Sequence, residues 1–253
     1  MSTERALLRV LGVGRRAGTA LLLESVSFAV DEGAVLAVLG ANGAGKSTLM
    51  AALAGDSTLD RGDIEFSGKP LAAWSPLELA SRRALNASEP PVPFAMSVAD
   101  YVALGRPFAA PDAEAVTAAL AECHADPWRA RDYATLSMGE QLRVQLARSL
   151  YQLGASEGRT RCLWLLDEPC AHLDMVQRQF VLKLMQRFAK ALQWAVVFST
   201  HDPMEAQAIA DHALLMRHGR ALLHAPTEHA LDETTLSACY GQPIVAAPAF
   251  IAK

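Results

Sequence analysis

Three short runs that are apolar except for Ser199 are the clearest feature of the chain. They cover residues 34–39, 162–166 and 195–199, and each has the length and composition of a strand that is buried on both faces. Segments with helical spacing of apolar residues separate them, most clearly at 176–192. Because strands that alternate with helices form parallel sheets covered on both faces, the pattern predicts an α/β fold with a mostly parallel sheet.

The regions outside these runs have a hairpin pattern. Residues 6–31 have the composition of two short strands joined by a polar turn at 12–19, and residues 64–66 alternate as an edge strand does. Residues 213–223 predict a second hairpin. We therefore expect an antiparallel portion, formed by the N-terminal segment, beside the parallel sheet.

The pattern changes again over residues 71–150, where alanine, leucine and charged residues occur at helical spacing. Ser75 and Ser97 are typical helix N-caps and mark where helices begin. We predict that 71–150 is a helical subdomain inserted between two parts of the α/β core, 1–70 and 151–253.

A glycine-rich sequence follows the first apolar run. It is Gly40-Ala41-Asn42-Gly43-Ala44-Gly45-Lys46-Ser47-Thr48, which fits the phosphate-binding loop G-x-x-x-x-G-K-[ST] between a strand and a helix. Glycines let the backbone curl around a phosphate, and the helix dipole adds to the anion site. We expect Lys46 to reach the β- and γ-phosphates and Ser47 to bind Mg²⁺, so the chain is predicted to bind a nucleoside triphosphate.

Two acidic residues follow the second apolar run. Asp167 stands at the carboxyl end of that strand, where a carboxylate next to a phosphate loop can hold Mg²⁺. Glu168, one residue further, could polarise a water for in-line attack on the γ-phosphate. The phosphate loop and this acidic pair together predict nucleotide hydrolysis.

Composition argues against nucleic-acid binding, a metal site built from cysteines, and a membrane-spanning segment. The formal net charge is −4, so the chain lacks the excess of positive charge that attracts a nucleic acid. The four cysteines are scattered, which favours reduced, buried thiols over a metal site. Glu4, Arg5 and Arg9 break any apolar leader, and no run is long enough to span a bilayer.

Three further segments make the chain resemble the ATP-binding subunits of ABC transporters. Leu136-Ser137-Met138-Gly139-Glu140-Gln141 resembles their signature motif, Ala171-His172-Leu173-Asp174 their D-loop, and Ser199-Thr200-His201-Asp202 their switch histidine. All the motifs occur in the family's order between Gly40 and Asp202. The resemblance implies one ABC ATPase domain, 1–253, with a P-loop NTPase core and an inserted helical subdomain that carries the signature.

The resemblance also implies roles for individual residues. Two subunits would stack head to tail around two ATP molecules, so that Ser137 and Gly139 bind the γ-phosphate held by the opposite subunit. Asp174 would tie the two sites together, and His201 would contact the γ-phosphate within its own subunit. The residues expected to bind ATP are Gly40, Asn42, Gly43, Ala44, Gly45, Lys46, Ser47, Thr48, Ser137, Gly139 and Asp174. Ser47 and Asp167 are expected to bind Mg²⁺, and Glu168, His201 and Lys46 to carry catalysis.

The sequence departs from the family pattern in three places. Met138 stands where the signature commonly has glycine, and residues 85–90 lack the usual glutamine that touches Mg²⁺, with Ser88 or Glu89 in its place. The aromatic residue that usually stacks on adenine is missing from 10–19, where Arg15 or Arg16 could stack instead.

Within the family the chain is most similar to the ATPases of importers for haem, iron-siderophores and vitamin B12. The segments 144–148, 153–159 and 236–244 suggest the haem branch. The resemblance implies a homodimer on two copies of a membrane permease, with a substrate-binding protein on the far side, at the cytoplasmic face of the bacterial inner membrane. The groove for the permease is predicted at 90–101, with Phe94 and Met96 either exposed in it or part of the core.

Other functions remain open on the sequence alone. The cargo could be an iron-siderophore or vitamin B12. The missing glutamine leaves room for a nucleotide-gated assembly subunit with weak hydrolysis, against which Glu168 and His201 argue. A soluble ABC ATPase acting on nucleic acid is disfavoured by the charge.

Overall fold

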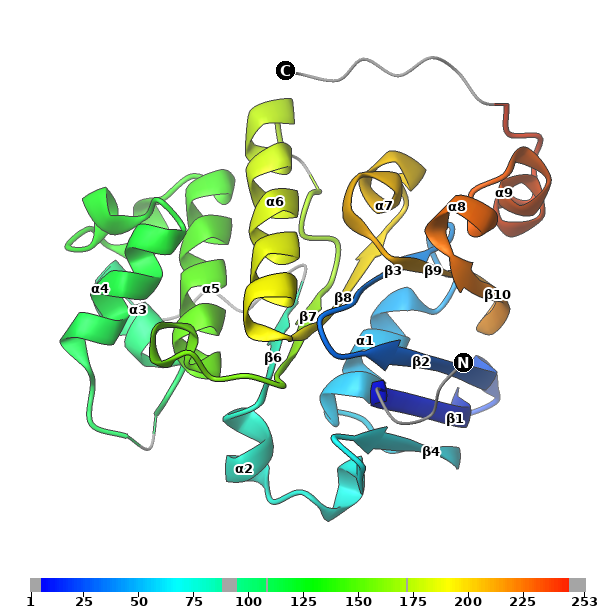
Figure 1. Ribbon diagram of the computed structural model, residues 1–253, viewed down its shortest axis with the longest axis horizontal. Coiled ribbons are helices and arrows are strands. Elements are labelled where there is room, and N and C mark those ends of the chain that lie inside the picture. The colour runs from blue at the N-terminus through cyan, green and yellow to red at the C-terminus, as the bar shows by residue number, and fades with distance from the viewer. Residues whose placement is uncertain (1–5, 88–94, 108, 172, 246–253) are drawn as a thin grey trace.

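The computed structural model describes residues 6–87, 95–107, 109–171 and 173–245. It has a helical part at the left of Figure 1, a large sheet that extends from the middle to the right, and a smaller antiparallel sheet below the right-hand part of the large sheet. The predicted α/β fold, mostly parallel with an N-terminal antiparallel portion and inserted helices, is confirmed.

The large sheet has the strand order β10-β9-β3-β8-β7-β6. Its strands are β3 (Val35–Leu39), β6 (Arg83–Asn86), β7 (Leu163–Leu166), β8 (Ala195–Thr200), β9 (His212–Arg217) and β10 (Arg220–Pro226). Neighbouring strands are parallel except for the hairpin β9–β10. Every residue of β3, β7 and β8 is buried, as their mostly apolar sequences predicted, and Ser199 and Thr200 at the end of β8 are buried as well.

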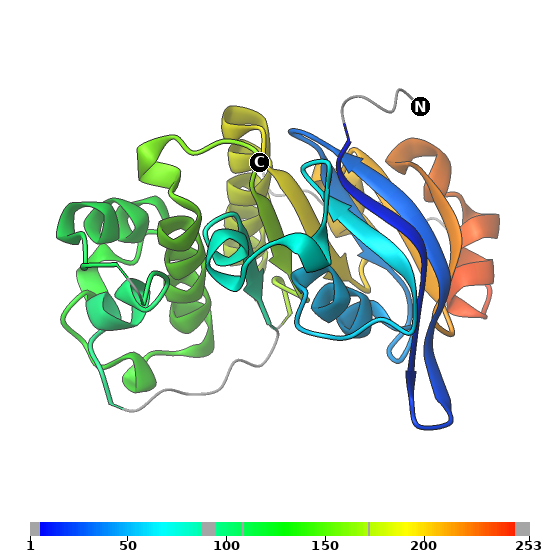
Figure 2. The same cartoon turned by 90° about the horizontal axis from the view of Figure 1, so that it is seen from below.

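The smaller sheet is antiparallel, with the order β2-β1-β4-β5. Its strands are β1 (Ala6–Ala17), β2 (Ala20–Asp31), β4 (Arg61–Phe66) and β5 (Lys69–Pro70). The polar turn expected at 12–19 is wrong, because β1 continues to Ala17 and only Gly18 and Thr19 lie between the strands. Bulges between β1 and β2 accommodate the polar residues, and the hairpin protrudes from the sheet in Figure 2.

Helices cover both faces of the large sheet. They are α1 (Lys46–Ala54), α2 (Pro76–Ala80), α3 (Val98–Ala103), α4 (Ala113–Glu122), α5 (Met138–Leu153), α6 (Met175–Leu192), α7 (Pro203–Ile209), α8 (Thr227–Ala230) and α9 (Glu233–Tyr240). The described residues also form 3₁₀ turns at Leu71–Ala73, Asp126–Trp128, Tyr133–Thr135 and Ala155–Glu157. Ser75 and Ser97 cap their helices as predicted, each accepting a backbone N–H three residues on.

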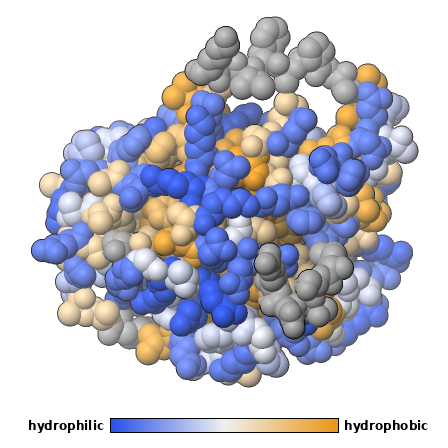
Figure 3. Space-filling view, viewed as in Figure 1, coloured by the Kyte–Doolittle hydropathy of each residue, from blue (hydrophilic) through white to orange (hydrophobic). Residues whose placement is uncertain are grey.

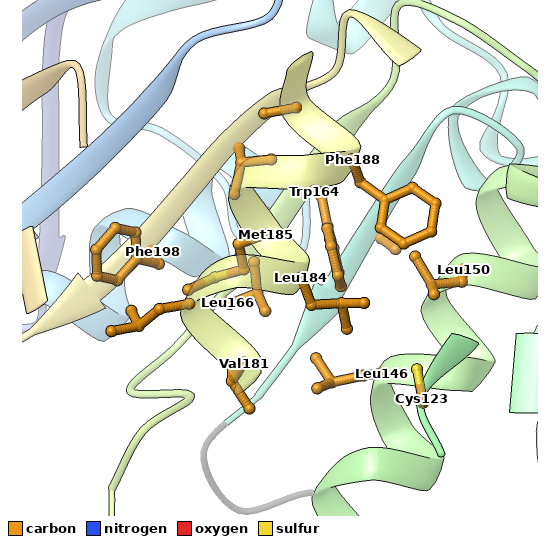
Figure 4. Packing of buried hydrophobic residues seen from close by; sticks show 14 of the residues in the cluster. Cys123, Leu146, Leu150, Trp164, Leu166, Val181, Leu184, Met185, Phe188 and Phe198 are labelled. Atoms are coloured by element: carbon orange, nitrogen blue, oxygen red, sulfur yellow. The ribbon is translucent and has the colours of Figure 1, made fainter. Parts of the chain in front are cut away.

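Two hydrophobic clusters form the core, one on each face of the large sheet. Because side chains alternate along a strand, Val35 and Ala37 of β3 join the larger cluster with the helices, whereas Leu36 and Val38 join the smaller cluster with α1 and the antiparallel sheet. In Figure 4, α5 and α6 both contribute to the larger cluster around Trp164 of β7.

On the face in Figure 3, hydrophobic surface occurs in separate patches among hydrophilic residues.

The short strand β6 was not predicted, although it lies within 71–150 and pairs with β7 in the large sheet. The division at residues 70 and 150 stays a prediction. The side-chain carbonyl of Asn86, at the end of β6, accepts hydrogen bonds from the Ser149 hydroxyl of α5 (2.7 Å) and the Trp164 indole of β7 (2.9 Å). Gln152 of α5 also donates to the carbonyl of Arg83 (2.9 Å). These bonds fasten the end of α5 to the sheet.

We predict that Asn86→Ala lowers the free energy of unfolding by about 2–4 kcal/mol, because it leaves the buried Ser149 and Trp164 donors unpaired. Ser149→Ala removes one bond and leaves Asn86 paired with Trp164, so it should cost only about 1 kcal/mol. Urea denaturation followed by tryptophan fluorescence measures both values. Equal losses of unfolding free energy in the two variants would show that Asn86 is not an acceptor shared by Ser149 and Trp164.

Candidate functional site

The predicted phosphate loop opens into a pocket at the carboxyl ends of β3 and β7, beside β2 and the turn between β9 and β10. The pocket has a volume of about 590 Å³ and is lined by Leu21, Leu22, Asn42, Gly43, Gly45, Lys46, Ser47, Thr48, Glu168, His218 and Gly219. Parallel strands bring their carboxyl ends to one edge of a sheet, which is why residues far apart in the sequence meet there.

Close backbone packing fixes the shape of the loop. Gly45 has φ 102°, and a Cβ there would lie 3.0 Å from the carbonyl oxygen of Leu22. A Cβ on Gly40 would lie 2.4 Å from the carbonyl oxygen of Met216. Both positions therefore need glycine.

The side chain of Lys46 is 5% exposed, and its ammonium group contacts this loop. It donates to the carbonyl of Gly40 (2.8 Å) and approaches the Glu168 carboxylate at 3.3 Å. A buried cation is stable only when it is paired. The lysine is thus held in place by the loop and by a carboxylate that a bound phosphate would have to replace.

The acidic pair after β7 is held by a side chain that the sequence did not single out. The Ser199 hydroxyl at the end of β8 donates to the Asp167 carboxylate and accepts from the backbone N–H of Glu168 (2.9 Å). Glu168 has φ 49°, in the left-handed region that non-glycine residues rarely adopt. Asp167 and Glu168 therefore face different surroundings: Asp167 is buried, and Glu168 lines the pocket. A serine within the apolar run 195–199 was the one signal of this contact.

His201 lies next to Glu168 on the loop after β8. Its imidazole is 60% exposed, and its Nδ1 is 3.7 Å from the Glu168 Oε2, beyond hydrogen-bond distance. Behind it, Glu205 of α7 is buried and accepts from the Thr200 hydroxyl (2.7 Å). Burial raises the pKa of Glu205, and the bond from Thr200 opposes that effect.

The signature and D-loop residues lie apart from this pocket. Ser137 caps α5 in a capping box with Glu140, whose pKa is lowered by the hydrogen bond from the Ser137 backbone N–H. Asp174 caps α6 and accepts from the backbone N–H of Gln177 (2.8 Å). A Cβ on Gly139 would lie 2.3 Å from the Gln177 side chain, so the two motifs are neighbours. None of Ser137, Gly139 and Asp174 lines the pocket.

The sequence left open which residue replaces the missing glutamine and which residue stacks on adenine. Ser88 and Glu89, the candidates for the missing glutamine, lie outside the described residues. Neither Arg15 nor Arg16 lines the pocket, which has Leu21, Leu22 and His218 at its side instead. Nothing in the spacing of these three residues indicated that they would meet.

The donor atoms near the loop suit a hard cation. Ser47, which carries a hydroxyl group, lines the pocket, and Asp167, which follows β7 beside Glu168, has a buried carboxylate. Mg²⁺ prefers such oxygen ligands together with phosphate oxygens and water, so these two residues fit the ion. Elsewhere in the described residues, no cluster of three or more His, Cys, Asp or Glu side chains could hold a metal.

No helix among the described residues has the length and apolar character needed to cross a membrane.

Comparisons with known proteins agree on one family. A family model described as ABC transporter matches residues 23–171. The hemin import ATP-binding protein HmuV of Methylobacillus flagellatus is 36% identical over 245 residues, which cover 94% of this chain and 91% of that protein. The protein of the same name from Pseudomonas putida is 39% identical over 242 residues, with 93% and 92% covered. An inward-facing ABC transporter described as a metal-chelate type has a TM-score of 0.79 at 29% identity, with 94% of this chain and 90% of that chain covered.

We predict that Glu168→Gln tightens the binding of ADP by about 3-fold, since the phosphates no longer compete with a carboxylate for Lys46. The effect is modest because Glu168 is partly exposed. Isothermal titration calorimetry measures the affinity. Glu157→Gln is the control, because it removes the same charge from an ion pair with Arg106 and Arg159 that does not line the pocket. An equal gain in both variants would mean that only net charge matters.

Proposed function

Because this chain belongs to the ABC transporter family, we propose that it is the ATP-hydrolysing subunit of a bacterial haem importer. The convergence of Lys46, Asp167 and Glu168 at one sheet edge supports hydrolysis. The haem assignment is carried by the similarity to two relatives named as hemin import proteins, which extends over 94% and 93% of this chain.

ATP would enter with its phosphates in the loop and Lys46 on the β- and γ-phosphates. The backbone N–H groups of Gly43 to Thr48 and the N-terminus of α1 favour this anion. Ser47 and Asp167 would hold Mg²⁺, which supplies positive charge to the phosphate oxygens when it is bound. Leu21, Leu22 and His218, which line the same pocket, would contact the rest of the nucleotide.

Glu168 would then be released from Lys46 and orient the attacking water. Its left-handed backbone turns it away from Asp167, so the two carboxylates can serve different purposes. His201, exposed beside Glu168, would contact the γ-phosphate. Lys46 would stabilise the charge that develops on the transferred phosphoryl group.

A second subunit would complete the site. Ser137, Gly139 and Asp174 do not line the pocket of their own chain, but a head-to-tail partner would bring its copies to it. Large apolar side chains are exposed beside these motifs, and burial between two subunits would cover them. They are Met138, Met175 and Val176.

We propose that closure of this dimer on ATP moves a permease pair and that hydrolysis reopens it. The assembly would stand at the cytoplasmic face of the inner membrane, with a substrate-binding protein on the far side.

Residues 90–94 of the proposed permease groove lie outside the described residues, and Met96 packs against the larger core cluster. The observed contact therefore favours a core role for Met96.

The transported cargo could instead be an iron-siderophore or vitamin B12. The chain could also be a nucleotide-gated assembly subunit that hydrolyses ATP weakly, an alternative favoured by the absence of glutamine from residues 85–90. The proximity of Glu168, Lys46 and His201 favours an active ATPase.

We predict that Glu168→Gln lowers steady-state phosphate release by about 100-fold or more, because the water loses its orienting carboxylate. ATP binding should persist, so the variant should form an ATP-bound dimer detectable by light scattering after size-exclusion chromatography. Glu157→Gln should retain wild-type turnover. Continued turnover by Glu168→Gln would remove Glu168 from the catalytic role.

The cargo is tested by growth of a bacterial strain that lacks this chain, with haem as the only iron source. We expect no growth on haem, normal growth on free iron, and rescue by the wild-type chain but not by Lys46→Ala, since that substitution removes the phosphate-binding cation. Normal growth on haem would exclude haem as the required cargo, and the same assay with siderophores or vitamin B12 would then identify the substrate class.

A further inference from the structure

A side chain from the C-terminal helix reaches the switch histidine. The hydroxyl group of Tyr240, the last residue of α9, donates to the backbone carbonyl of His201 at 2.8 Å. The two residues are 39 positions apart, and no sequence motif links them. The contact therefore depends on how α9 packs against the core.

The rest of the loop around His201 is also fixed by side chains. The Thr200 hydroxyl accepts from the backbone N–H of Asp202 (3.0 Å), and Arg178 of α6 donates to the Asp202 carboxylate (3.1 Å). The imidazole itself is exposed, and its closest acidic partner, Glu168, is 3.7 Å away. The direction of this imidazole is thus set by its backbone more than by contacts of its ring.

Helix α9 is firmly attached to the sheet. Arg217 of β9 donates to the carbonyl of Ala238 (2.7 Å), and the buried thiol of Cys239 lies 3.5 Å from the carbonyl oxygen of Met216. Burial raises the pKa of the Tyr240 phenol, and the nearby Cys239 and Asp202 act in the same direction. Tyr240 therefore stays protonated and remains a hydrogen-bond donor throughout the working pH range.

We propose that Tyr240 is a positioning residue for ATP hydrolysis. Its hydroxyl fixes the carbonyl of His201 and so holds the imidazole ready for the γ-phosphate. Groups that are already oriented need no reorganisation when the transition state forms, and misplacement of such a group lowers kcat. The inference rests on the proposed function, because it assigns Tyr240 a role that acts through His201.

The test is Tyr240→Phe in the full-length chain, which removes the hydroxyl and keeps the ring. We expect kcat for ATP hydrolysis to fall by about 3- to 10-fold, the range that one neutral hydrogen bond spans. The affinity for ADP, which lacks the γ-phosphate, should not change. Tyr151→Phe is the matched control, because it removes a buried hydroxyl that accepts from the Asp112 backbone N–H in the helical part; it should keep wild-type kcat.

A double-mutant cycle separates positioning from a general structural effect. In a His201→Ala background, Tyr240→Phe should change the residual single-turnover rate by less than about 2-fold, since the group that Tyr240 positions is gone. The same 3- to 10-fold loss in both backgrounds would overturn the proposal.

Hydrogen exchange gives a second readout that does not require residual activity. Tyr240→Phe should speed amide exchange in peptides that cover 199–205, while peptides from β3 keep wild-type rates. Unchanged exchange together with unchanged kcat would overturn the inference. An unimpaired His201→Ala, or a wild-type chain without ATPase activity, would instead count against the proposed function, and the exchange result would still test whether Tyr240 holds the loop.

Discussion

The register of three parallel strands positions almost every charged group of the site. Leu39 of β3 pairs with Thr200 of β8, so Gly40 and the phosphate loop begin beside His201. Leu166 of β7 pairs with Phe198 of β8, so Asp167 follows beside Ser199. A slip of one residue would turn each side chain to the opposite face of the sheet and separate these groups. The buried apolar faces of the strands, packed on both sides, prevent such a slip.

The carboxyl edge of the large sheet stabilises buried charges and a strained backbone, which would cost free energy elsewhere in the protein. Lys46 and Asp167 are nearly buried, and the carbonyl of Gly40 and the hydroxyl of Ser199 compensate for the water that they have lost. Glu168 has a strained backbone, which persists because Ser199 binds its N–H. The two core clusters thus provide the free energy that lets a few charged residues remain dehydrated and oriented before any ligand arrives.

The sequence was sufficient for the parts of the fold that depend on local pattern. The strands β3 and β7 are unbroken apolar runs, β8 is apolar up to Phe198, and the caps Ser75 and Ser97 follow local hydrogen-bond chemistry. Strand β6 was missed because four residues in an alanine-rich context carry no period. The turn at 12–19 was misplaced because bulges let polar residues remain in strands.

The pocket was predictable to the extent that its residues occur in motifs. The meeting of Lys46 with Glu168 follows from the strand order of a P-loop fold. Ser199 and Tyr240 were not recognised, because their importance arises from tertiary contacts with residues 31 and 39 positions away. The roles proposed for Ser137, Gly139 and Asp174 would depend on a second chain, because none of the three lines the pocket of its own chain.

The attachment of α5 to the sheet has a mechanical consequence. Asn86 and Arg83 hold its C-terminal end through Ser149 and Gln152, whereas its N-terminal end carries the signature serine. Sixteen residues of α-helix span about 24 Å. A rotation of about 10° around the fastened end would therefore swing the signature through about 4 Å. The helix would act as a lever whose pivot lies beside β6, the strand that precedes residues 88 and 89, where the family usually has a glutamine.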